Sequence, residues 1–92
     1  MEYFVYILLS QKDNELYIGY TNDIQRRFRE HTQSQVSATK HRLPLRLIHY
    51  EVFINLQDAK ARETFLKSGF GHNQLKSKLK YTLKCATSDV AR

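Results

Sequence analysis

The chain contains one cysteine, one proline, three glycines and no tryptophan among its 92 residues. With Cys85 as its only cysteine, it lacks the thiols for an intramolecular disulfide or a cysteine-ligated zinc site. Apolar runs stay well below the roughly 18 residues that span a bilayer, and the first residues lack the basic start of a signal peptide. We therefore expect a single soluble domain that is cytoplasmic, does not associate with membranes and is stabilised by packing alone.

Basic charge is unevenly distributed along the chain. Fifteen Lys and Arg residues against nine Asp and Glu residues give a formal net charge of +6. Residues 1–22 hold one basic and three acidic side chains, whereas residues 23–50 hold six and two and residues 51–92 hold eight and four. A polyanion such as nucleic acid is therefore the first partner to consider, and a merely solubilising surface is the alternative.

Hydrophobic periodicity and turn residues predict six elements of secondary structure. Strands are expected at residues 3–9, 16–21 and 45–54. Helices are expected at residues 24–31, from 55 or 58 to about 67, and from 72 to about 83. This β-β-α-β-α-α order indicates an α+β fold in which a small three-stranded antiparallel sheet is flanked by about three helices. We expect the domain to cover residues 1–83 and residues 84–92 to form a flexible tail.

Two tyrosines and a glycine occupy the first two predicted strands. Strand alternation places Tyr6 on one face of the first strand and Tyr17 with Gly19 on one face of the second. A glycine inside a strand weakens the sheet and marks the close approach of another group. From the pattern alone, packing in the core is the favoured role of the tyrosines, because tyrosine is common in strands.

The first predicted helix carries a cluster of basic side chains. Arg27 and His31 are four residues apart and share a face beside the apolar stripe. The planar guanidinium of Arg27 suits phosphate oxygens, which makes it a candidate phosphate clamp. Arg26 and Arg29 are expected to point outward, toward solvent or a nucleic-acid backbone. A solvated face is the alternative for the Arg27–His31 pair.

The second predicted helix places a carboxylate on its apolar stripe. Ala59 and Leu66 lie on either side of Glu63 at helical spacing. Carboxylates are rarely buried without a partner. Two interpretations stay open at this point: an ion pair with Arg27, or a ligand for one Mg²⁺ ion, which often takes a single protein carboxylate and keeps several waters.

Five sequence segments, taken in order, resemble the GIY-YIG endonuclease superfamily, and above all its small stand-alone bacterial members. The segments are Val5-Tyr6-Ile7, Leu16-Tyr17-Ile18-Gly19, Asp23-Ile-Gln-Arg-Arg27, His31 and Ala59-Lys-Ala-Arg-Glu63. The similarity extends from Tyr3 to about Leu83. Phe4 stands where the first motif usually has glycine, and the superfamily's late asparagine has no secure counterpart, with Asn73 as the nearest candidate.

The resemblance implies a metal-dependent endonuclease that hydrolyses DNA phosphodiester bonds, with one Mg²⁺ or Mn²⁺ ion and no organic cofactor. By this resemblance Tyr17 is the general base or water-positioning residue and Tyr6 is its companion from the first motif. Arg27 is the residue that stabilises the phosphate, His31 relays protons or holds the water, and Glu63 is the metal ligand. The superfamily includes homing endonucleases and the incision subunit of nucleotide excision repair, so DNA repair or processing is the expected setting.

Exposed basic side chains are expected to contact DNA phosphates without taking part in the chemistry. The candidates are Arg26, Arg29, Lys40, Arg42, Lys76 and Lys78. A different class of function is a catalytically silent nucleic-acid-binding module of the same fold, and a third is a structural or protein-interaction domain. The set of Tyr6, Tyr17, Arg27 and Glu63 favours the enzyme, because a binding module has no need for an inward carboxylate.

Overall fold

Three strands form one antiparallel sheet in the order β2-β1-β3, as expected for the α+β fold. The computed structural model describes residues 1–91, with side chains described through Ala86. The elements in chain order are β1 (Tyr3–Ser10), β2 (Leu16–Thr21), α1 (Ile24–Thr32), β3 (Leu45–Phe53), α2 (Leu56–Lys67), α3 (Gly69–Lys78) and α4 (Lys80–Ala91). Within the described residues, none of these helices is both long enough and apolar enough to cross a membrane.

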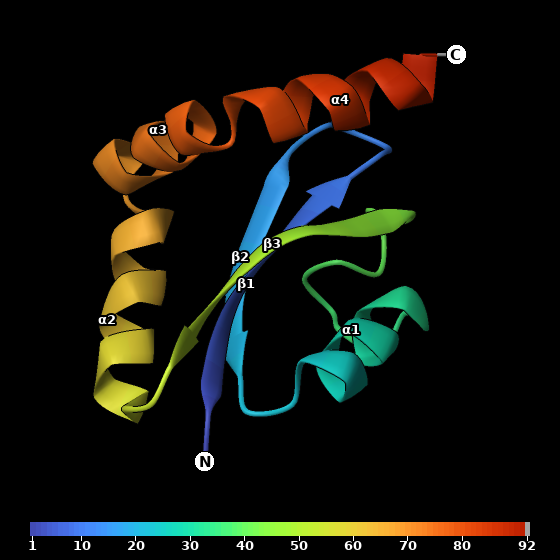
Figure 1. The fold of residues 1–92 in the computed structure, drawn as a ribbon. Helices are drawn as coiled ribbons and strands as arrows, with labels where there is room; N and C mark the ends of the chain where they lie inside the picture. Colours follow the sequence, from blue (N-terminus) through green and yellow to red (C-terminus); the bar gives the residue numbers. More distant parts are fainter. Residues whose placement is uncertain (92) are drawn as a thin grey trace.

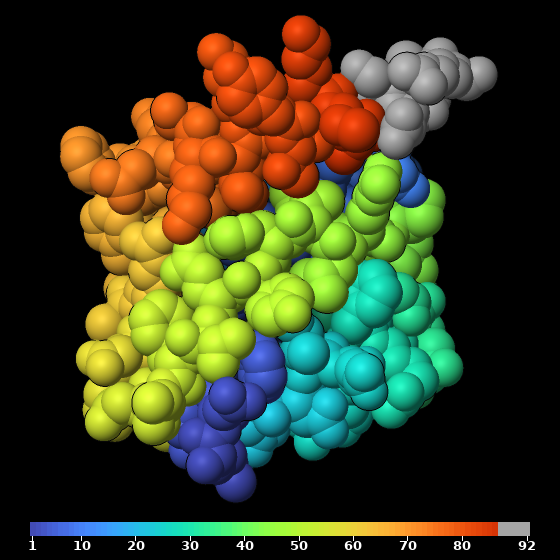
Figure 2. Space-filling view, in the orientation of Figure 1, coloured from blue at the N-terminus to red at the C-terminus, as the bar shows by residue number. Residues whose placement is uncertain are grey.

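Strand β1 lies at the centre of the sheet because its side chains are apolar on both faces. Val5 through Ser10 are all buried. Tyr6 pairs with Gly19 on β2 and with Tyr50 on β3, and the β1–β3 register shifts by an irregularity between Ile7 and Leu8. The two edge strands are β2 and β3, and Figure 2 shows β3 running uncovered across the surface between α1 and α4.

Helices cover both faces of the sheet and create two apolar clusters (Figure 1). On one face, Phe28 and Ile24 of α1 pack against a cluster that contains Tyr6 and Leu8. On the other face, helices α2 and α3 pack on a cluster built from Val5, Ile7, Ile18, Ala59, Leu66, Leu75 and Leu79. Consequently α1 and α2 lie on opposite sides of the sheet, and their side chains can meet only around the β2 edge.

Side-chain caps set where the first two helices begin. The Asp23 carboxylate accepts a hydrogen bond from the backbone N–H of Arg26 at the start of α1. Asn55 caps α2 in the same way, accepting from the N–H of Gln57. Each cap satisfies a backbone donor that has no partner inside the helix. Of the two caps considered for the second helix, Asn55 is the one used.

The C-terminal third of the chain differs from the expectation of one helix from 72 to about 83 and a tail over 84–92. Two helices are present: α3 begins at Gly69, because the Ser68 hydroxyl caps it by accepting from the N–H of Gly71. The chain changes direction at Leu79, whose side chain is buried, and α4 continues through Ala91 with Ala86 buried. Residue 92 lies outside the described residues, and the flexibility of this segment stays a prediction.

Candidate active site

A pocket of about 530 Å³ lies at the β2 edge of the sheet, where α1 and α2 approach each other. Tyr6, Tyr17, Arg27 and Glu63, which the sequence analysis selected, all line it together with Gly19. Tyr6 and Tyr17 come from neighbouring strands, Arg27 from the helix on one face, and Glu63 from the helix on the other. These four side chains therefore converge on one concave surface.

Gly19 creates the space for the Tyr6 ring. These two residues are directly paired across β1 and β2. A Cβ atom on residue 19 would lie 2.5 Å from the Tyr6 hydroxyl oxygen and 2.6 Å from Cζ. The phenol therefore lies over the glycine, toward the β2 edge, which explains why a glycine interrupts an otherwise well-formed strand.

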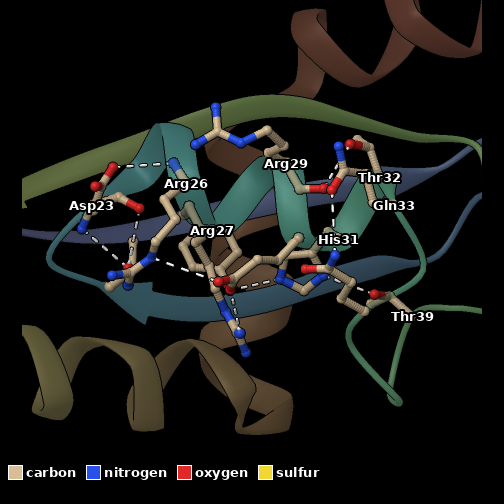
Figure 3. A network of polar contacts seen from close by, with 12 residues as sticks. Asp23, Arg26, Arg27, Arg29, His31, Thr32, Gln33 and Thr39 are labelled. Carbon is tan, nitrogen blue, oxygen red and sulfur yellow. Dashed lines mark hydrogen bonds and ion pairs between the residues drawn. The ribbon is translucent and has the colours of Figure 1, made fainter.

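The Tyr6 hydroxyl belongs to a buried chain of polar contacts. Its oxygen lies 2.9 Å from Nε2 of His31, and Nδ1 of His31 lies 2.7 Å from the hydroxyl of Thr39. His31 is fully buried and does not belong to the pocket lining, so it lies behind Tyr6 instead of facing a substrate. Figure 3 shows His31 extending from α1 toward Thr39 in the loop that follows the helix.

Burial controls the protonation of the Tyr6 phenol and the His31 imidazole. Desolvation raises the pKa of Tyr6 to about 12, against a smaller lowering effect from a hydrogen bond with Arg27. Burial also lowers the pKa of His31 to about 4, and the positive charge of Arg27 adds to that effect. Both follow from the cost of placing a charge where water is excluded. Near pH 7, therefore, the Tyr6 phenol is protonated and the His31 imidazole is neutral.

Arg27 presents a fixed positive charge to the pocket. Its guanidinium nitrogen donates a hydrogen bond of 3.0 Å to Glu30 on the same helix, and its pKa is raised chiefly by a hydrogen bond with Tyr6. Figure 3 shows Arg27 and Arg29 leaving α1 in opposite directions. Arg27 is thus held between a carboxylate and a phenol, with guanidinium surface left in the pocket for an anion.

Glu63 supplies the carboxylate of the pocket. Its side chain is only 17% exposed, and one oxygen lies 3.2 Å from the ammonium group of Lys67, one turn later on α2. Among the described side chains Glu63 thus pairs with Lys67, and Arg27 pairs with Glu30, so the ion pair considered between Arg27 and Glu63 is not the arrangement found.

The donor set fits a divalent ion held mainly by water and substrate. The described residues contain no group of three or more His, Cys, Asp or Glu side chains that could hold a metal. A single carboxylate in an open pocket is nevertheless a common arrangement for Mg²⁺, which keeps several waters and takes further oxygens from a phosphate. Glu63 is the residue of this pocket that could hold such an ion.

The basic residues expected to contact DNA differ in their surroundings, and Arg26 is the one of the six that lines the pocket. The Nε of Arg26 lies 3.7 Å from a carboxylate oxygen of Glu30, which also pairs with Arg27. Arg29, Lys40 and Lys76 are exposed elsewhere on the surface. The remaining two are engaged in ion pairs: Arg42 with Asp13 at 3.2 Å, and Lys78 with Glu51 at 3.6 Å.

The pocket lining also includes Lys60 and Tyr20, which the sequence pattern did not single out. The ammonium nitrogen of Lys60 lies 6.0 Å from the centre of the Tyr20 ring, a distance that permits a cation–π contact. A signal for Lys60 was available, because it precedes Glu63 by three residues and so shares its helix face. Tyr20 follows Gly19 directly and points to the opposite face of the strand, which made it resemble an ordinary surface residue.

The fold and the pocket define a small α+β domain with tyrosine, arginine and glutamate side chains gathered at one edge of its sheet. The chain belongs to the GIY-YIG family: the family model described as the GIY-YIG catalytic domain matches residues 2–78. It is 40% identical over 67 residues to a UPF0213 protein of Haloquadratum walsbyi, covering 72% of this chain and 74% of that one. It is 35% identical over 85 residues to a UPF0213 protein of Limosilactobacillus reuteri, covering 89% and 83%.

A solved structure is similar in both sequence and fold. The solution NMR structure of the UPF0213 protein BH0048 from Bacillus halodurans is 35% identical to this chain, with a TM-score of 0.53. The match covers 84% of each chain. The resemblance stated from the sequence motifs is thus confirmed at the level of the family and of the α+β fold.

Proposed function

We propose that the protein is a metal-dependent endonuclease that hydrolyses DNA phosphodiester bonds in the pocket at the β2 edge, in DNA repair or processing. The observation that carries the proposal is the convergence of Tyr6, Tyr17, Arg27 and Glu63 on that one pocket from four different elements. A structural role would not require two phenols, a guanidinium and a half-buried carboxylate to face the same solvent-filled space. Membership of the GIY-YIG family, whose domains generally act on DNA, supports the same function.

The two tyrosines have different roles in this proposal. The Tyr6 hydroxyl is held in hydrogen-bond contact with His31, and its pKa of about 12 keeps it protonated. Tyr6 is therefore a poor base at neutral pH and serves to orient its neighbours. Tyr17, beside it on β2 and lining the pocket, is then the phenol that positions or deprotonates the attacking water.

Arg27 and Glu63 supply the charges that phosphoryl chemistry needs. Negative charge accumulates on the phosphate as water attacks, and a fixed cation aimed at that charge lowers the barrier. Arg27 is that cation, since its charge is permanent and its position is fixed by contacts with Glu30 and Tyr6. Glu63 would hold one Mg²⁺ or Mn²⁺ ion, which when bound supplies positive charge beside the leaving oxygen.

Arg26 and Lys60 are the proposed contacts to the phosphates on either side of the cleaved bond. Both line the pocket, one from α1 and one from α2, so a strand in the pocket would pass between them. Arg29, Lys40 and Lys76 are proposed to attract DNA from longer range, because they are exposed but away from the pocket. Arg42 and Lys78 are expected to contribute least, since each faces a carboxylate and neither lines the pocket.

A cleavage assay over a panel of DNA forms tests the proposal. Duplex, single-stranded, flap and junction DNA would be incubated with the wild-type protein in Mg²⁺, in Mn²⁺ and in a chelator. Cleavage of at least one form that requires the divalent ion and is lost in Glu63→Gln is expected. Salt-dependent binding without cleavage of any form would instead support the catalytically silent nucleic-acid-binding module.

Asp58→Asn is a matched control for Glu63→Gln in this assay. Asp58 is an exposed carboxylate on the same helix and does not line the pocket. Its loss should leave cleavage unchanged. Equal loss of cleavage in both variants would mean that the effect comes from α2 as a whole and not from a ligand in the pocket.

A further inference from the structure

The loop between α1 and β3 buries two side chains, the apolar Val36 and the polar Thr39. Thr39 is completely buried although its neighbours Ala38 and Lys40 are exposed. Its hydroxyl oxygen lies 2.7 Å from Nδ1 of His31, the nitrogen that faces away from Tyr6. The loop is fastened beside it by the Ser10 hydroxyl, which donates a hydrogen bond of 2.7 Å to the Arg42 carbonyl.

The contacts around Tyr6 fix the direction of the hydrogen bonds. Arg27 shares the pocket with the Tyr6 phenol, and a guanidinium can only donate, so it favours a phenol that turns a lone pair toward it and its proton away. The single proton of the phenol is then free to donate to Nε2 of His31, 2.9 Å away. A neutral imidazole whose Nε2 accepts must carry its proton on Nδ1. That proton in turn donates to the hydroxyl oxygen of Thr39.

We propose that Thr39 is a positioning residue, whose buried hydroxyl holds His31 in the Nδ1–H tautomer and thereby fixes the Tyr6 phenol as a donor to His31 and an acceptor from Arg27. Thr39 does not reach the pocket and touches no substrate. It acts through two successive hydrogen bonds, from Thr39 to His31 and from His31 to Tyr6. Residues that do not touch the substrate commonly orient in this way the side chains that do. Its effect on cleavage rests on the proposed function, but its effect on the tautomer does not.

The surroundings of His31 favour this single arrangement. The rings of Tyr6 and Tyr17 contact the imidazole edge-on, at centroid distances of 5.6 Å and 5.1 Å. The charged groups that act on it are Arg27 and Glu30, both on its own helix and of opposite sign. With aromatic rings on the sheet side and a hydroxyl on the loop side, the imidazole has one acceptor and one donor partner and stays neutral.

Nitrogen NMR of the His31 imidazole tests the proposal without any reference to activity. In ¹⁵N-labelled wild-type protein near pH 7, long-range proton–nitrogen spectra should show Nδ1 protonated and Nε2 unprotonated. An Nε2–H tautomer, or an even mixture of the two, would overturn the proposal whether or not the protein cleaves DNA. The wild-type measurement also stands if a Thr39 variant fails to fold.

Two substitutions at Thr39 extend the test to function. Thr39→Val keeps the volume but removes the hydroxyl, so His31 should lose its single tautomer and kcat should fall about tenfold with little change in KM, the size of effect that one lost hydrogen bond produces. Thr39→Ser should restore both. Thr32→Val, at an exposed threonine on α1, is the control and should change neither. A Thr39→Val protein with an unchanged tautomer and rate, or a Thr39→Ser protein that fails to recover, would contradict the proposal.

Discussion

The phenol of Tyr6 lies over the backbone of Gly19, so close that a Cβ on residue 19 would come within 2.5 Å of the hydroxyl oxygen. The same hydroxyl is held by the buried imidazole of His31. The ring therefore has little room to move away from an added methyl group. Gly19 is better understood as part of the architecture of the site than as a weak point of the strand.

Gly19→Ala should consequently displace the Tyr6 ring and destabilise the protein by about 1–3 kcal/mol, the usual cost of overpacking a well-filled interior. Urea unfolding of the variant measures this cost. Gly69→Ala is the matched control, because nothing lies within 4 Å of its added Cβ and the residue begins a helix. Its stability should stay the same or rise slightly. Equal, small effects at both glycines would contradict a close contact at Gly19.

The depressed pKa of His31 predicts how stability depends on pH. The pKa is about 4 in the folded protein and 6.5 in the unfolded chain, so between these values the unfolded chain binds the additional proton. The contribution of neutral His31 to the free energy of unfolding is fully present above pH 6.5. It is lost as the pH falls to 4, and its size is on the order of 3 kcal/mol. Urea unfolding from pH 4 to pH 7 measures it.

His31→Gln serves as the comparison, because glutamine does not titrate. The variant should be less stable near pH 7 but should show a much flatter pH dependence between 4.5 and 6.5. Asp13 and Glu51 also have lowered pKa values. The stability that these two carboxylates contribute is lost at more acidic pH than the stability that depends on His31. Parallel curves for wild type and variant would contradict burial of a neutral His31.

Much of this architecture was predictable because local pattern and tertiary packing agree. The apolar run at residues 3–9 predicted the strand that forms β1, and the periodicity from residue 24 predicted α1, which begins there. The spacing of Tyr6, Tyr17, Arg27 and Glu63 led to the family and hence to the pocket. Strand alternation and helix periodicity express the same geometry that brings these side chains together.

Other features depend on contacts that no local pattern contains. Thr39 reaches His31 from a polar loop, and a buried threonine in such a loop has no periodicity to reveal it. The pairing of Glu63 with Lys67 depends on side-chain conformations within α2. The break at Leu79 has no local stop signal, because neither glycine nor proline lies beside this buried residue. Tertiary packing decided the first and the last of these, and side-chain conformation within one helix decided the second.

Glu63→Gln should separate metal binding from folding. The carboxylate pairs with Lys67, which is 53% exposed and four residues away on the same helix. Such pairs contribute only about 0.3–0.5 kcal/mol, so thermal unfolding should change little. Cleavage should fall strongly and recover in part with excess Mn²⁺. A large loss of thermal stability with unchanged cleavage would mean that Glu63 is structural.

The salt dependence of DNA binding should identify the phosphate contacts. Each phosphate neutralised contributes roughly −0.9 to the slope of log K against log salt concentration. Lys60→Ala and Arg26→Ala should each make that slope shallower by about one unit, because both residues line the pocket. Lys78→Ala is the control and should change the slope less, because Lys78 lies outside the pocket lining and is paired with Glu51. An equal change in slope for Lys60→Ala, Arg26→Ala and Lys78→Ala would contradict DNA binding centred on the pocket.

The most direct measurement of the central claim is the single-turnover cleavage rate of Arg27→Ala, alongside its affinity for DNA. Arg29→Ala is the matched control, since Arg29 leaves the same helix in the opposite direction (Figure 3). The account predicts that Arg27→Ala cleaves about 10²–10³-fold more slowly, as for the loss of one donor to a developing oxyanion, while binding DNA nearly as well. Arg29→Ala should cleave at the wild-type rate. Equal rates for Arg27→Ala and wild type would contradict an active site at the β2 edge.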